Sequence, residues 1–104
     1  MARFDVYAHP DAQSRRKTPF LLDIQNEYIN ALDTRIVMPM RAAASYGLRM
    51  RDLNPEFMID GQAVVLDAAA LAAFPARELR RRVTNLRERR EDIIAALDSL
   101  IGAH

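Results

Sequence analysis

The sequence has no cysteine and no tryptophan, and only two histidines and three glycines among its 104 residues. Without cysteine, the chain can form neither a disulfide nor a thiolate metal site. The histidines, His9 and His104, lack the spacing of metal ligands. The three glycines, Gly47, Gly61 and Gly102, are too scattered to form a phosphate-binding loop. We therefore expect no metal and no other cofactor.

Long apolar runs are missing as well. No stretch approaches the roughly twenty apolar residues of a membrane span, and Asp5 stands where a signal peptide would need an apolar segment. We therefore expect a cytoplasmic protein with a single domain over residues 1–104. The net charge of +1 gives no general attraction to nucleic acid. Residues 77–92 hold seven arginines and four acidic residues, a local excess of +3 that we interpret as a solvated helix face and its approach.

Apolar and alternating segments indicate an antiparallel sheet. Three segments have strand composition: residues 3–7, 20–29 and 34–40. The first alternates polar and apolar residues, which predicts a half-buried strand. Pro39 should end the third strand or confine it to a sheet edge, because proline cannot donate a ladder hydrogen bond. Asp60 and Gly61, between two apolar runs, predict a β-hairpin. The alanine-rich residues 67–74 have helical propensity, but the segment is too short to assign.

The carboxy-terminal segment has the pattern of an amphipathic helix over residues 86–101. Its apolar side chains recur at helical spacing: Leu86, Ile93, Ile94, Leu97, Leu100 and Ile101. Asn85 and Glu88 have the spacing of a capping box, and Gly102 is a natural stop. A weaker periodicity back to Leu79 would allow an earlier start. Arg90 lies near the middle of the stripe, and we expect its stem to cover the core and its head to pair with an acid.

Together these elements predict an α+β fold, in which a barrel-like antiparallel sheet is followed by one helix. Catalytic motifs are scarce, since neither Ser14, Ser45 nor Ser99 stands in a nucleophile turn. The segment from His9 and Asp11 to the cations at residues 15–17 could supply the groups of a nuclease, although we favour a solvated loop with an exposed histidine. Four methionines are expected to fill gaps in the core: Met38, Met40, Met50 and Met58.

Five segments of the chain resemble the CcdB family of plasmid and chromosomal toxins, in order and spacing, over essentially the whole length. The segments are R-F-D-V-Y, L-L-D-I-Q, R-I-V-M-P-M, L-N-P-E-F-M-I-D-G and V-T-N-L-R-E-R-R-E-D-I-I-A-A-L. The resemblance implies an SH3-like antiparallel β-barrel with a carboxy-terminal α-helix, assembled as a homodimer. Family members are not enzymes, and they bind the A subunit of DNA gyrase and trap the complex in which DNA is cut.

The resemblance also implies partners and a binding surface. A CcdA-type antitoxin would neutralise this toxin of a type II toxin–antitoxin module, and the pair would repress its own operon. Contact with nucleic acid is then expected only indirectly, through the antitoxin complex. Carried over by position, the gyrase-binding surface has two residues at the end of the second strand, two on the helix and a three-residue tail: Tyr28, Ile29, Asp98, Ile101, Gly102, Ala103 and His104.

Two alternatives remain at this point. The MazF type of toxin shares the barrel but cleaves RNA, and it would use loop side chains such as His9 and Arg15. A degenerate homologue would keep the fold without poisoning gyrase. The second alternative is motivated by the tail, because the family's aromatic anchor, a tryptophan, falls at the position of Gly102 and this chain has none.

Overall fold

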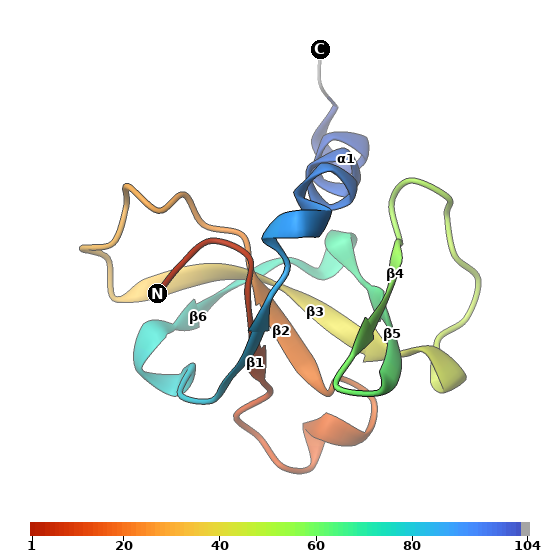
Figure 1. The fold of residues 1–104 in the computed structure, drawn as a ribbon, viewed down its shortest axis with the longest axis horizontal. Coiled ribbons are helices and arrows are strands. Elements are labelled where there is room, and N and C mark those ends of the chain that lie inside the picture. Colours follow the sequence, from red (N-terminus) through yellow and green to blue (C-terminus); the bar gives the residue numbers. More distant parts are fainter. Residues whose placement is uncertain (103–104) are drawn as a thin grey trace.

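The structure, a computed structural model, describes residues 1–102 and shows a curled antiparallel β-sheet with a carboxy-terminal helix (Figure 1). The strands are β1 (Asp5–Ala8), β2 (Phe20–Asp23), β3 (Thr34–Ala42), β4 (Glu56–Ile59), β5 (Gln62–Leu66), β6 (Ala72–Pro75) and β7 (Arg82–Asn85), and the helix is α1 (Arg90–Ile101). The strand order is β4-β5-β3-β2-β1-β7, and β6 also pairs with β3. This half-barrel with one helix confirms the predicted α+β, SH3-like fold.

Both faces of the central strands are buried. On one face a large apolar cluster combines sheet residues such as Val6 and Leu22 with the buried Ile93 and Ala96 of α1, and the partly buried Ile94 and Leu97 of the helix pack against it. On the other face a smaller cluster is made by Tyr7, Leu21, Val37 and Leu79. The strand predicted from the alternation is therefore confirmed as β1, but it is fully rather than half buried.

The prediction for Pro39 needs correction. Pro39 does not end β3, which continues to Ala42. Its carbonyl accepts a hydrogen bond from the Asp67 N–H at 2.9 Å, on the side where β3 changes partner from β6 to β5. In a strand the N–H and C=O of one residue point to the same side, so the missing donor falls in the gap between the two partner strands.

The Asp60–Gly61 hairpin is confirmed. Both residues have positive φ, 52° at Asp60 and 79° at Gly61, as a type I′ turn between β4 and β5 requires. The alanine-rich segment after β5 forms a single 3-10 turn, Ala68–Ala70, and then strand β6. Strand β6 pairs with β3 along Thr34–Val37, and this pairing outweighs the helical propensity of the alanines.

The helix begins later than predicted. Residues 82–85 form β7, which pairs with β1, and α1 starts at Arg90 after a 3-10 turn at Arg87–Arg89. The Asn85–Glu88 capping box is absent. The Asn85 side-chain oxygen accepts the Arg87 N–H at 2.8 Å, and its amide donates to the Arg3 carbonyl and the Asp5 carboxylate, each at 3.0 Å. The end at Gly102 is confirmed, since its φ is 79° and its N–H donates to the Asp98 carbonyl.

Two further side-chain predictions were partly wrong. Met38 and Met40 are fully buried, but Met50 and Met58 are 66 % and 68 % exposed. Arg90 is exposed and hydrogen-bonds the Arg87 carbonyl, and within residues 1–102 it has no ion pair. None of the helices in this part of the chain is long and apolar enough to cross a membrane.

Candidate functional site

Tyr28 and Ile29 lie in the β2–β3 loop and not at the end of a strand, because β2 stops at Asp23. The Asn26 side chain breaks the strand by accepting the Tyr28 N–H at 2.9 Å, and its carbonyl accepts the Ile29 N–H at 3.0 Å. The resulting turn points the tyrosine outward. Tyr28 is 96 % exposed and Ile29 is 47 % exposed.

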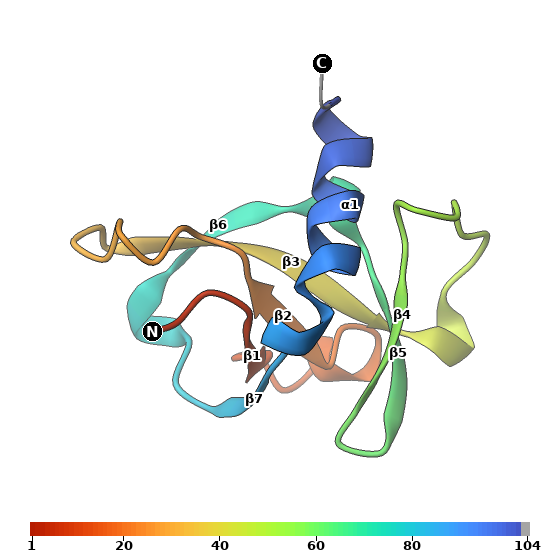
Figure 2. The same ribbon diagram turned by 45° about the horizontal axis from the view of Figure 1, so that its top comes forward.

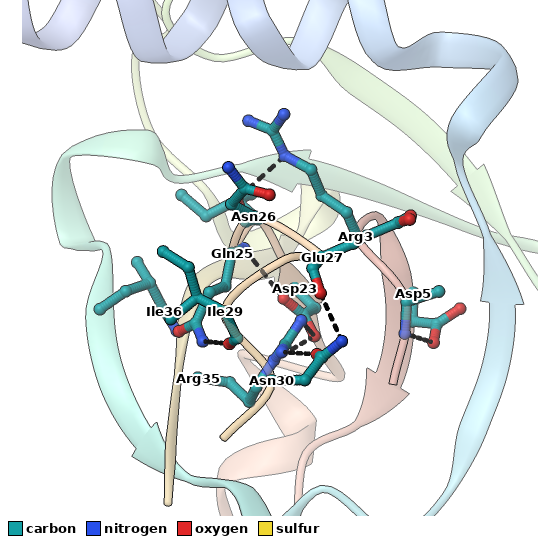
Figure 3. A network of polar contacts seen from close by, with 12 residues as sticks. Arg3, Asp5, Asp23, Gln25, Asn26, Glu27, Ile29, Asn30, Arg35 and Ile36 are labelled. Atoms are coloured by element: carbon teal, nitrogen blue, oxygen red, sulfur yellow. Dashed lines mark hydrogen bonds and ion pairs between the residues drawn. The ribbon is translucent and has the colours of Figure 1, made fainter. Parts of the chain in front are cut away.

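The loop that carries these residues is braced from inside by Gln25 (Figure 3). The buried Gln25 side chain donates to the Ile29 carbonyl at 2.7 Å and accepts the Ile36 N–H at 3.1 Å. The Asn30 amide adds a hydrogen bond to the Glu27 carbonyl. One side chain thus joins the outgoing and returning halves of the loop, so the exposed apolar residues sit on a defined support.

A buried ion pair anchors the base of the same loop. The Arg35 guanidinium lies 2.8 Å from the Asp23 carboxylate through both Nε and Nη2, and neither side chain is more than 2 % exposed. Arg35 Nη1 also donates to the Asn30 side chain at 2.8 Å, as Figure 3 shows. Burial raises the pKa of Asp23, against the opposing effect of the Gln25 N–H and Arg35.

The carboxy-terminal end of α1 carries the other described residues of the predicted surface, Asp98, Ile101 and Gly102. The helix stands away from the sheet along its last turns, as the two ribbon views show (Figures 1 and 2). Ile101 is 67 % exposed and Asp98 is also exposed. The remaining predicted tail residues, Ala103 and His104, lie outside the described residues.

Within one chain the predicted residues therefore form two groups. Tyr28 lines a hollow of about 330 Å³ together with residues of the amino terminus, of its own loop and of the start of the helical region: Arg3, Phe4, Asn26, Glu27, Arg87 and Arg90. Glu27 and Arg87 approach to 3.9 Å across it. Ile101 is eleven residues beyond Arg90, or roughly 16 Å along a helix. The structure thus brings Tyr28 to the beginning of α1, and the helix end forms a separate group.

Sequence reasoning missed the arginine-rich lining of this hollow. Arg3 donates to the Ile24 carbonyl at 3.1 Å, and its guanidinium carbon lies 4.9 Å from the centre of the Phe4 ring. Phe4 has a φ of 73°, which is uncommon for a bulky residue. The signal available beforehand was Arg90, a cation placed within an otherwise apolar stripe.

The residues of the nuclease hypothesis lie at the opposite end of the sheet. The His9 Nδ1 accepts the Asp11 N–H at 3.0 Å, and the Ser14 hydroxyl donates to the Asp11 carboxylate at 2.6 Å. Burial lowers the pKa of His9. His9 and Arg15 line a second hollow of about 330 Å³ with Glu78, Arg80 and Arg81, which Asp11 does not line. Across residues 1–102 no three His, Cys, Asp or Glu residues gather as metal ligands would.

Comparison with known proteins supplies the family. A comparison with curated proteins found no match. The family model described as CcdB protein matches residues 3–102 of the 104-residue chain, which includes the sheet, the helix and the two groups of exposed residues. The chain therefore belongs to the CcdB family, whose members are toxins of toxin–antitoxin systems that act on DNA gyrase by binding.

Proposed function

We propose that this protein is the toxin of a type II toxin–antitoxin module, which binds the A subunit of DNA gyrase in the cytoplasm and traps it. The action is binding and not catalysis, and it needs no cofactor. A CcdA-type antitoxin neutralises the toxin, and the pair represses its own operon. The observation that carries the proposal is the exposed apolar group on the braced β2–β3 loop, in a chain that belongs to the family.

Tyr28 is the aromatic anchor in this proposal. The chain has three tyrosines and four phenylalanines, all within the described residues, and Tyr28 alone among them is almost fully exposed. Interface energy is concentrated in a few Tyr, Trp and Arg side chains near the centre of the contact. With Arg3, Arg87 and Arg90 around the adjacent hollow, Tyr28 supplies the aromatic contact that the family's tail tryptophan supplies elsewhere.

The helix end is the second contact, formed by Asp98, Ile101 and the tail Gly102 to His104. Within a single chain this group lies apart from Tyr28, so a homodimer is part of the proposal. A two-fold axis repeats each group on the partner subunit, and it presents a symmetric surface to a target that is itself two-fold symmetric. Ile29 and Ile101 are exposed apolar side chains, which a dimer or a partner would cover.

A supercoiling and cleavage assay with purified gyrase from the source bacterium tests the proposal. The full chain is compared with a chain truncated after Ile101 and with Ile101→Asp. We expect cleaved DNA to accumulate with the full chain and to fall sharply with both variants. Met58→Asp is the matched control, because Met58 is equally exposed, at 68 % against 67 % for Ile101, but lies on β4.

The alternatives give different results in the same experiment. A MazF-like ribonuclease would leave gyrase unaffected, would cleave RNA, and would lose its toxicity on His9→Ala or Arg15→Ala while tolerating the truncation. A degenerate homologue would affect neither substrate and would not inhibit growth when expressed. Either result would refute gyrase poisoning while leaving the fold and the family intact.

A further inference from the structure

The end of the sheet opposite to α1 carries a basic face that the proposed function does not use. It consists of six cationic residues on the β1–β2 loop and the β6–β7 connection: Arg15, Arg16, Lys17, Arg77, Arg80 and Arg81. Within residues 1–102 none of the six forms an ion pair, although six other arginines of the chain do. The acids of the two segments are Asp11, which is held by Ser14, and Glu78.

The fold holds the two segments together. The Ala8 N–H at the end of β1 donates to the Arg81 carbonyl at 2.9 Å, and His9, Arg15, Arg80 and Arg81 line one hollow of about 330 Å³. In Figure 1 the β1–β2 loop and the β6–β7 connection both lie in the lower half of the view, away from α1. Arg15, Arg80 and Arg81 therefore share one surface, remote from the helix end.

Two of these arginines are oriented by the backbone. Arg15 donates through Nε to the His9 carbonyl at 2.6 Å, and Arg80 donates through Nε to the Arg77 carbonyl at 3.2 Å. Each bond uses one of the five N–H donors of a guanidinium and leaves the terminal nitrogens for a ligand. Terminal guanidinium nitrogens match the geometry of a phosphate, which they contact with two parallel bonds.

We propose that the basic face binds the phosphodiester backbone of double-stranded DNA directly, with Arg15, Arg80 and Arg81 as its centre. This contact goes beyond the indirect contact through an antitoxin that the family resemblance implies. It does not depend on gyrase, because it uses the opposite end of the molecule.

The absence of apolar anchors favours nucleic acid over an acidic peptide. The strongly exposed large apolar residues among residues 1–102 all lie elsewhere, in the amino terminus, the β2–β3 and β3–β4 loops, β4 and the end of α1. A peptide partner requires buried anchors at the centre of its interface. Backbone binding to nucleic acid is achieved by cations alone through the release of counterions.

The same surface favours a duplex over a single strand. Single-strand binders stack bases on exposed aromatic rings. Here the two rings beside the hollow, His9 and Phe74, pack edge to face against each other at 5.9 Å and are only partly exposed. The phosphates of a duplex need no such platform.

Fluorescence anisotropy with a labelled duplex of about 20 base pairs tests the proposal, with salt varied from about 50 to 200 mM. We expect Arg80→Gln/Arg81→Gln to weaken binding about tenfold at the lower salt, and to reduce the slope of log affinity against log salt by about two. Arg49→Gln/Arg51→Gln is the control. It removes the same charge from two exposed residues of the β3–β4 loop, and it should bind like the parent chain.

Each other outcome contradicts the proposal. Equal loss in both double variants would mean a general charge effect without a site. Tighter binding to a polyglutamate peptide of matched charge would identify a carboxylate-binding surface instead. Tighter binding to a single-stranded RNA of the same length would exclude the duplex as the preferred ligand. Thermal unfolding of both variants checks that the exposed substitutions leave the fold intact. Gyrase is absent throughout, so this experiment can fail while gyrase poisoning stands.

Discussion

Arginine has different roles at the two ends of the molecule. At the β2–β3 loop, Arg35 is buried and paired with Asp23, and it holds up a loop whose exposed tip is aromatic and aliphatic. At the β1–β2 end, Arg80 and Arg81 are exposed and have no acidic partner within residues 1–102. A buried arginine fixes the local structure, whereas an exposed one keeps its charge available.

The difference indicates what kind of partner each end accepts. A protein interface gains its energy from a few rigid, well-packed anchors, and rigidity matters because ordering a loose loop on binding costs free energy. The braced Tyr28 loop meets that requirement. A phosphate backbone is bound through many solvated cations and tolerates their mobility, which suits the basic face.

Breaking the buried Asp23–Arg35 ion pair should have the largest effect, on the stability of the fold. We expect Arg35→Met to lower the free energy of unfolding by about 3–5 kcal/mol, because it leaves the Asp23 carboxylate buried without its cation. Arg81→Met, at the basic face, should change it by less than about 0.5 kcal/mol. Urea denaturation measures both values.

A double variant separates the ion pair from the packing around it. Asp23→Leu/Arg35→Met removes both charges, so it should recover most of the lost stability. The loop should still loosen, because the Gln25 N–H and the Asn30 side chain lose their partners. Faster hydrogen exchange at the Ile36 amide would report this loosening. If Arg35→Met were as stable as the parent chain, the contrast between the two ends would be wrong.

The sequence was sufficient to predict much of this fold because local signals agreed with the tertiary structure. The Asp60–Gly61 turn needs positive φ at both residues, and the Gly102 stop needs the same freedom. Prediction failed where a distant partner decided the structure. Residues 82–85 are a strand because β1 offers them partners 75 to 80 residues away, and no local pattern contains that information.

The candidate site was predicted less completely. Tyr28 and Ile101 were named by resemblance, and both are exposed. The buried ion pair at the base of the Tyr28 loop was not foreseen, since nothing in the local pattern around Asp23 or Arg35 indicates a buried pair across twelve residues. Arg80 and Arg81 had been interpreted as part of a solvated helix approach. Their lack of an acidic partner within residues 1–102 is visible only in the structure, where Arg82 of β7 forms the ion pair with Asp5 and its two neighbours form none.

Removing the exposed anchor should have the next largest effect, on affinity alone. We expect Tyr28→Ala to weaken binding to the gyrase A subunit by about 2 kcal/mol, or roughly thirtyfold. Because Tyr28 is 96 % exposed, the Tyr28→Ala variant should have the same unfolding midpoint and the same affinity for duplex DNA as the parent chain. Met58→Ala is the control, and calorimetric titration gives the affinities. Equal affinities for Tyr28→Ala and the parent chain would remove Tyr28 from the gyrase-binding surface.

The smallest effect is confined to acidic pH, and it distinguishes Arg82 from Arg80 and Arg81, which form no ion pair within residues 1–102. The Asp5 carboxylate accepts hydrogen bonds from Arg82 at 2.8 Å and Asn85 at 3.0 Å. Burial alone would raise the pKa of Asp5, but these bonds and the Ala2 N–H outweigh it and hold the pKa below its ordinary value.

A carboxylate with a lowered pKa in the folded state stabilises the protein above its unfolded pKa of about 3.9, and this contribution is lost as pH falls through the folded value. We expect the stability advantage of the parent chain over Asp5→Asn to be present at pH 6 and to shrink progressively below about pH 4. Urea midpoints across that range measure it. Arg81→Gln should follow the parent curve, because Arg81 forms no ion pair with a carboxylate within residues 1–102. If Arg81→Gln instead followed Asp5→Asn, Arg81 would be tied into the same network and would not be free to meet a phosphate.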